Sequence, residues 1–270
     1  MNRVFTVLAT VLFAGCAAVP DVAPPLDAGT PPLPIVTTRV AALVDGEVST
    51  YAAYVGPLRV AELEYTLRRL DVDGRPMLVI DGITRMSGIA GIVARAGGTL
   101  RTVVDPTDFL PTTSMWTTAT ADPKSRAVAF DRRRAVAAAW TRDWIATARI
   151  PGERLLDPLS GVWVVRVLAP PPDGEEHRAL VVEGTAVHLL TYRRVAVPEV
   201  PDADPVERWT IRSDDVDPET GRLRGTPPKT LVTVDVESVP PHRILRLEGR
   251  MAFGSVRVGL ETAADVRPSR

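Results

Sequence analysis

The residue whose type and position most clearly predict a chemical reaction is the one cysteine of the chain, Cys16. It follows the small residues Ala14 and Gly15 at the end of an apolar run, Val4–Phe13. A transmembrane helix needs about 20 apolar residues, so a run half that long does not span a bilayer. A cysteine thiol can carry acyl chains, and each CH₂ that enters a membrane contributes about 0.8 kcal/mol of binding free energy. Cys16 is therefore the candidate residue for lipid attachment.

The start of the chain resembles the signal sequence of bacterial lipoproteins, in which the cysteine is acylated and becomes the mature N-terminus. Arg3 supplies the basic start of such a signal, and Phe13 stands where leucine is usual. The resemblance implies a signal peptide over residues 1–15; the alternatives are an ordinary cleaved signal with an incidental cysteine, or a buried apolar cysteine. Ala17 follows the cysteine in place of aspartate, as in lipoproteins sorted to the outer membrane. We therefore expect a cell-envelope protein, lipid-anchored at the periplasmic face of the outer membrane.

Three histidines are the next candidates for chemistry. His177, His188 and His242 lie far apart in the sequence and show none of the spacings with Cys, Asp or Glu that mark metal sites. The sequence also lacks the G-x-S-x-G pattern of hydrolase serines and the glycine loop that binds phosphate. We expect a non-enzymatic protein with no catalytic residue, no metal site and no cofactor.

One acidic segment, Asp215–Gly221, has the alternating carboxylates of a calcium-binding loop. Its glycine falls one place late, Pro218 interrupts it, and position twelve is Thr226 where such loops have glutamate. We favour a solvated hairpin loop, with cation binding as the open alternative. The shorter segment Asp71–Gly74 is explained as a hairpin turn, because an Asp-Gly pair accepts positive φ.

Composition excludes several classes of partner. Removal of residues 1–15 takes away one basic residue, which leaves 31 basic against 33 acidic residues and a net charge near −2. A chain this close to neutral has no electrostatic surface for nucleic acid, so we expect no nucleic-acid partner. With Cys16 acylated, no disulfide can form, and the folded part must be stabilised by its own apolar core.

The chain divides into a tether and one folded domain. Residues 16–38 contain six prolines among small and polar residues, a composition typical of an extended, non-globular tether. The remainder is long enough for one core. We expect a single β domain over residues 39–265 and a short tail, 266–270.

Alternation of apolar and polar residues predicts many short strands. In 60–67, for example, Ala61, Leu63, Tyr65 and Leu67 alternate with polar or smaller neighbours, which indicates a half-buried strand. Turn residues recur about every ten positions, so the sequence predicts an all-β domain: a curved antiparallel sheet or open β-barrel with one or two short helices. The predicted strands are 48–55, 60–70, 75–85, 99–104, 112–118, 178–183, 186–197, 209–212, 230–237, 243–247 and 255–262.

One helix is predicted, over residues 157–168. Asp157 suits the N-cap and Pro158 the first helical position, and a proline triplet follows at 170–172. Leu156, Leu159, Trp163 and Val167 would share one face, which we expect to pack against the concave side of the sheet. Several valines oppose the helix, since β-branched side chains lose χ1 freedom in it.

Four pieces of the sequence resemble a bacterial envelope family defined as domain of unknown function 3108. They are the strand pair around 51–67, Val104-Asp105 with Leu110-Pro111, the segment 156–166, and Pro241-His242-Arg243-Ile244 with 254–256 behind it. The resemblance spans most of 45–262, is poor over 206–226, and implies a curved antiparallel sheet in an exported protein with no catalytic residues to carry over.

Residues 131–148 admit two structures. Val136, Trp140, Trp144 and Ala148 recur every four residues, which favours a helix. The same stretch can form strands joined by tight turns at 127–131, 135–140 and 144–149. The family resemblance favours the strands, and we follow it.

Three functions compete at this point. The first is a non-enzymatic envelope lipoprotein that binds an apolar or amphipathic, lipid-like ligand on its curved sheet. The second is a structural or assembly partner of another envelope protein, and the third is an envelope hydrolase, which would need paired carboxylates or a nucleophile with its base in one cleft. A helix that fills only one end of the sheet's concave side would favour the first.

Lipid attachment is tested by metabolic labelling. We expect labelled palmitate to enter the wild-type protein and not Cys16→Ser, because the thiol is the acylated group. A labelled Cys16→Ser variant, or a wild-type protein recovered entirely without membrane, would contradict the lipoprotein prediction.

Overall fold

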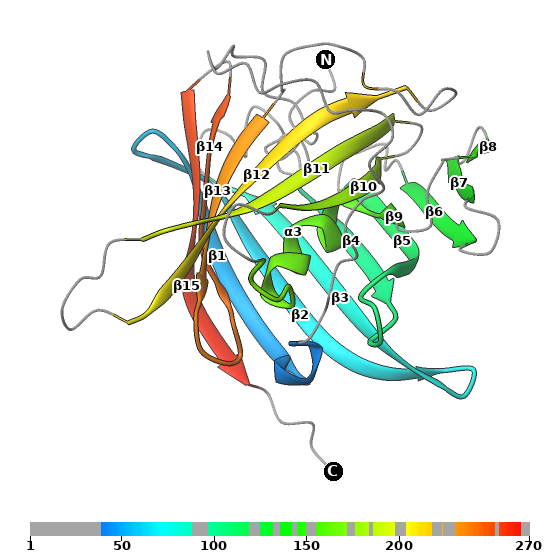
Figure 1. The fold of residues 1–270 in the computed structure, drawn as a ribbon, viewed down its shortest axis with the longest axis horizontal. Helices are drawn as coiled ribbons and strands as arrows, with labels where there is room; N and C mark the ends of the chain where they lie inside the picture. The colour runs from blue at the N-terminus through cyan, green and yellow to red at the C-terminus, as the bar shows by residue number, and fades with distance from the viewer. Residues whose placement is uncertain are drawn as a thin grey trace.

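The computed structural model describes residues 39–87, 97–118, 125–131, 136–141, 145–149, 155–171, 176–183, 186–197, 204–217, 223, 230–251 and 254–265. In these residues fifteen strands form one sheet, which curls around a short helical segment (Figure 1). The predicted signal peptide, tether and tail, with Cys16, lie outside the described residues and stay predictions.

The sheet is antiparallel and almost entirely sequential. Its spatial order is β8-β7-β6-β5-β4-β3-β2-β1-β15-β14-β13-β12-β11-β10-β9, so the chain starts in the middle of the sheet and β15 returns to pair with β1. Only the edge strand β9 is parallel to its neighbour, β10. The strands are β1 (Glu47–Val55), β2 (Leu58–Val72), β3 (Arg75–Met86), β4 (Gly97–Val104), β5 (Pro111–Thr118), β6 (Ser125–Asp131), β7 (Val136–Thr141), β8 (Ile145–Arg149), β9 (Leu155–Leu156), β10 (His177–Glu183), β11 (Ala186–Val195), β12 (Val206–Val216), β13 (Thr230–Glu237), β14 (Ile244–Met251) and β15 (Gly254–Asp265).

These strands confirm the predicted fold class of a curved antiparallel sheet. Within 131–148, the residues that the structure describes belong to β6, β7 and β8, so the strand alternative is correct there and the helix is not. The β2–β3 hairpin closes through Asp73 and Gly74, both at positive φ, and the Asp71 carboxylate accepts a hydrogen bond from the Gly74 amide at 2.7 Å. β12 begins at Val206, earlier than predicted, and covers part of the region where the family resemblance is poor.

The predicted helix is shorter than expected. α3 (Pro158–Trp163) continues as a 3₁₀ turn, η2 (Val164–Arg166), and Val167 and Leu168 lie beyond it. Two successive valines at the junction disfavour the α-helix and suit its ending in a tighter turn. The segment is also buried on every side and not on one face only, because the sheet surrounds it.

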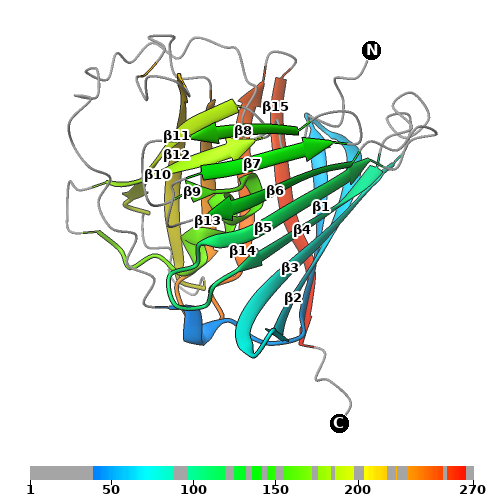
Figure 2. The same cartoon turned by 90° about the vertical axis from the view of Figure 1, so that its right-hand side faces the viewer.

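The two ends of the sheet overlap instead of joining by backbone hydrogen bonds. On β10, Val181 faces the helical segment, so its neighbour Val182 points to the other face of the sheet. Val182 packs in a second apolar cluster with Val128 and Phe130 of β6. Figure 2 shows β6–β8 passing in front of β9–β12. The sheet is therefore an open barrel whose first edge lies over the outer face of its last strands.

The outer face of β2–β4 carries cross-strand ion pairs. Arg68 and Arg101 both bind Asp81, the latter with an Nε–Oδ1 distance of 2.6 Å, and Arg85 bridges Glu62 and Glu64. Partial burial alone would raise the pKa of Asp81, but hydrogen bonds from Arg101 and Arg68 hold it below its usual range. Exposed ion pairs contribute at most about 1 kcal/mol each.

None of the helices in the described part of the chain is long and apolar enough to cross a membrane.

Candidate functional site

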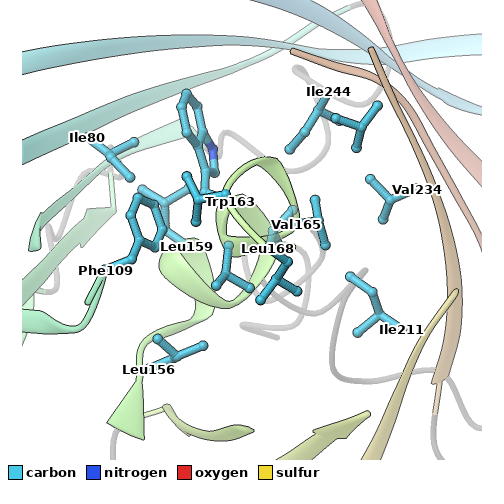
Figure 3. Close-up of a cluster of buried hydrophobic side chains, with 14 of the residues drawn as sticks. Ile80, Phe109, Leu156, Leu159, Trp163, Val165, Leu168, Ile211, Val234 and Ile244 are labelled. Atoms are coloured by element: carbon cyan, nitrogen blue, oxygen red, sulfur yellow. The ribbon is translucent and has the colours of Figure 1, made fainter. Parts of the chain in front are cut away.

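The interior of the barrel is the candidate site, and the segment Asp157–Leu168 is the element that shapes it. We call this segment the plug. Leu159, Trp163, Val165 and Leu168 point outward from it toward strands on opposite walls (Figure 3). Ile80 and Phe109 line one wall, and Ile211, Val234 and Ile244 line the other.

The N-terminal end of the plug is held by Asp157, which is fully buried. Its Oδ1 accepts hydrogen bonds from the Leu159 amide at 2.9 Å, the Ser160 amide at 3.3 Å and the Thr102 hydroxyl of β4 at 2.9 Å. Its Oδ2 accepts from the Ser160 hydroxyl at 2.8 Å. The residue is thus both the predicted N-cap and a tie to the sheet. Burial raises the pKa of Asp157, although the hydrogen bonds from Ser160 and Thr102 oppose that rise.

The C-terminal end of the plug is held by Arg166. Its guanidinium donates to both carboxylate oxygens of Glu47 on β1, at 3.0 and 2.8 Å, and both side chains are 1% exposed. It also donates to the carbonyl oxygens of Pro241 and His242 at 3.0 Å each, and lies 4.6 Å from the Trp163 ring centre. Every charge of this buried pair therefore has a partner, which is the condition for burying it without a large penalty.

The residues of the sheet that bind the two ends of the plug, Glu47 and Thr102, lie on one row of residues paired across the strands. Glu47 pairs with Leu67, Leu67 with Ile80, and Ile80 with Thr102, so Glu47 and Thr102 are three strand spacings apart on the inner face. Three spacings are about 14 Å, and the nine residue steps from Asp157 to Arg166 rise about 14 Å as a helix. The plug therefore fits across four strands, with a polar tie at each end.

One end of the barrel, where β1 begins, is closed below the plug. Val40 of η1 (Val40–Ala42), Leu43, Phe109 and Leu110 are all buried there. Arg69 donates to the Val40 and Leu43 carbonyls at 3.2 and 3.3 Å. Arg39 binds Glu207 of β12 through two hydrogen bonds of 2.9 Å. The first residues of the described chain thus form the closure.

Toward the opposite end, where Gly56 turns β1 into β2, inward-facing apolar side chains stay partly exposed. These residues pack against the core from five strands: Tyr65, Met86, Leu100, Leu247 and Leu260. Each pairs with an inward-facing residue, as Leu247 does with the buried Val234 and Val258.

Aromatic rings connect these side chains to the plug. The Tyr65 ring lies edge-on to Tyr51 at 5.7 Å and to Trp163 at 5.8 Å. A Cβ at Gly82 would lie 2.8 Å from the Tyr65 ring, so glycine is required where that ring crosses β3. Burial raises the pKa of Tyr51 to about 12, which keeps this phenol neutral. The surface above the plug is apolar and uncharged at these positions.

The structure separates the three histidines, as their sequence positions suggested. His188 Nδ1 lies 3.0 Å from Asp215, His242 Nδ1 3.1 Å from the Glu237 carbonyl, and His177 Nε2 2.9 Å from the Ala169 carbonyl. In the described ranges no group of three or more His, Cys, Asp or Glu side chains is placed to hold a metal ion. The end of the Asp215–Gly221 segment, from residue 218, lies outside those ranges, so its cation binding stays untested.

Neither the Glu47–Arg166 pair nor the closure by Arg39 was predicted from the sequence. Glu47 and Arg166 are 119 residues apart, and no local pattern connects them. A signal for one of them exists: Arg166 is a charged residue inside the run Val164–Leu168, which is otherwise apolar. A charge in such a run must find a partner if the run is buried.

Comparison with known proteins gives the fold and no function. No family model and no curated protein sequence matches the chain. Among solved structures it is similar to a beta-barrel-like protein of the domain of unknown function DUF1849 from Brucella abortus. The TM-score is 0.50 at 8% identity, over 84% of this chain and 100% of that one. This supports a barrel-like fold; the resemblance to domain 3108 is left untested and stays a prediction.

The pH dependence of stability tests the first anchor. A raised pKa of Asp157 in the native state means that its stabilising contribution is complete below the unfolded pKa and is lost as pH rises through the native pKa. In Asp157→Asn the cap oxygen remains, and the Ser160 hydroxyl can donate to the residue-157 carbonyl. We expect the free energy of unfolding of this variant to increase relative to that of the wild type as pH rises, by at most about 1.4 kcal/mol per pH unit.

Urea unfolding at several pH values measures this difference. A gap between the two proteins that is constant with pH, or that moves against the variant as pH rises, would contradict the raised pKa.

Proposed function

We propose that this protein is a non-enzymatic, lipid-anchored binding protein of the bacterial cell envelope whose ligand is apolar or amphipathic. The observation that supports the ligand is the set of inward-facing apolar side chains that stay partly exposed above the plug. We call these residues, Tyr65, Met86, Leu100, Leu247 and Leu260, the apolar rim.

The asymmetry of the interior supports a directional site. Below the plug, Leu78, Val104 and Phe109 are wholly buried, so that end is filled by the protein itself. Above it, side chains of the same chemical type on the same face of the sheet are accessible to water. Apolar area that stays in contact with water is the area that an apolar ligand gains by covering, at about 25 cal/mol per Å².

The contrast between the two faces of the sheet favours a ligand inside over one outside. The outer face of β2–β4 carries the ion pairs around Asp81 and Arg85, which would have to be desolvated by an apolar ligand. The rim carries no ionisable group other than a phenol. An acyl chain would therefore be preferred on the inner face.

Anchoring through Cys16 is consistent with the position of Arg39 in the fold. Arg39 enters at the closed end of the barrel, where its backbone amide also donates to the Val167 carbonyl. A tether that joins the body there leaves the apolar rim on the opposite side from the attachment point. In this arrangement the end of the barrel that binds the ligand lies away from the lipid anchor.

Ligand binding is tested by a matched pair of substitutions. We expect the wild type to bind cis-parinaric acid, a fluorescent fatty acid, and Leu247→Arg to bind it at least about tenfold more weakly, since a guanidinium would replace an apolar wall. Leu231→Arg is the control, because Leu231 lies on the outward-facing side of β13 and is 46% exposed.

Far-ultraviolet circular dichroism and thermal unfolding show whether both variants keep the fold. The proposal fails if the wild type binds no fatty acid, or if the two variants lose affinity equally.

A further inference from the structure

We propose that His177 and Trp209 form a binding site for a single hydroxyl group in the barrel interior. The site lies on the inner face of β10 and β12, beside the C-terminal end of the plug. Its existence is independent of the proposed function; only the identification of a ligand hydroxyl as its occupant rests on that function.

The two side chains are buried neighbours. His177 is 6% exposed and Trp209 is wholly buried, and their ring centres are 6.3 Å apart. Register places them on one face: His177 pairs with Tyr192, Tyr192 pairs with Ile211, and Trp209 lies two residues from Ile211. Both rings therefore face the interior.

Each ring has one buried nitrogen without a hydrogen-bond partner, Nδ1 of His177 and Nε1 of Trp209. Such atoms are rare in folded proteins and call for an occupant. The other imidazole nitrogen, Nε2, lies 2.9 Å from the Ala169 carbonyl oxygen, which can only accept. Nε2 therefore carries the proton, and in the neutral ring Nδ1 is an acceptor.

The unpartnered atoms are thus a donor and an acceptor on neighbouring rings. The indole N–H only donates, and the imidazole Nδ1 only accepts. A carboxylate could bind the first but not the second, and an ammonium the second but not the first. A hydroxyl group accepts through its oxygen and donates through its hydrogen, so one hydroxyl satisfies both atoms.

The position of Trp209 connects the site with the apolar rim. Trp209 pairs with Val234, and Val234 pairs with Leu247 of the rim. Two strand spacings, about 10 Å, separate Trp209 from Leu247 along this inner-face row. Val234 and Trp209 are wholly buried, so a chain held on the rim reaches Trp209 only with its end inserted between core side chains. The hydroxyl therefore comes either from an ordered water molecule or from a long-chain alcohol.

A crystal structure of the ligand-free, full-length protein at high resolution tests the first source. We expect one oxygen atom within about 2.7–3.2 Å of both His177 Nδ1 and Trp209 Nε1. Its presence supports the site with water as the occupant, whether or not the protein binds fatty acids.

Matched ligands test the second source. Competition with cis-parinaric acid compares 1-decanol with decyl methyl ether, which has the oxygen but no hydroxyl hydrogen. We expect the alcohol to bind about tenfold more tightly than the ether, as one hydrogen bond allows, and Trp209→Phe to abolish this preference. A change in packing would alter the affinities for the alcohol and the ether alike. Trp209→Phe and His177→Phe must therefore lower the affinity for the alcohol and leave the affinity for the ether unchanged.

The outcomes separate the two proposals. A bridging water without any ligand binding supports the hydroxyl site and overturns the proposed function. A preference for the alcohol that both variants abolish supports the site with the ligand as occupant. A structure with no oxygen between the rings, together with equal affinities for alcohol and ether, overturns the site.

Discussion

The buried ion pair between Arg166 and Glu47 is the constraint on which the interior depends. An unpaired guanidinium in an apolar interior costs several kcal/mol, so Arg166 must meet its partners wherever the plug lies. Those partners come from β1 and from the turn before β14, which are far apart in sequence. Any other position of the plug would leave a charge buried and unpaired. The pair therefore specifies one position of the plug more than it adds net stability.

That position explains why the barrel has two different ends. The distance from Glu47 to Thr102 along the row matches the rise from Asp157 to Arg166, so the plug lies across the strands and not along the barrel. Side chains on one side of it are covered by η1 and Phe109, while the apolar rim on the other side keeps contact with water. Because the plug is too short to fill the whole interior, apolar side chains on the inner face stay in contact with water. The overlap of β6 with β9–β12 closes the wall without a continuous hydrogen-bonded ladder.

Most of the fold could be predicted from local sequence, and little of the site could. Alternation predicts which side chains of β2 face inward, and the Asp73-Gly74 pair predicts the turn that follows. Asp157-Pro158 predicts the start of the helix. Each of these features depends only on neighbours in the chain. The predicted end of the helix was wrong because the successive valines at 164 and 165, whose weight against packing the sequence could not resolve, end the α-helix early in a 3₁₀ turn. The Glu47–Arg166 and Arg39–Glu207 pairs are contacts over more than a hundred residues, which periodicity does not encode. The fully apolar run Ala179–Val182 is a signal of burial on both faces, and the overlap accounts for it.

The most direct test of this account is the free energy of unfolding of Glu47→Gln, Arg166→Met and the double variant, measured in urea. If this pair holds the plug, the free energy of unfolding of each single variant is lower than that of the wild type by about 3–5 kcal/mol, since each substitution leaves a buried polar partner unsatisfied. The double variant should lose clearly less than the sum of the two, because it removes both charges together. Single losses below about 1 kcal/mol, or losses that add fully in the double variant, would contradict the claim that this pair positions the plug.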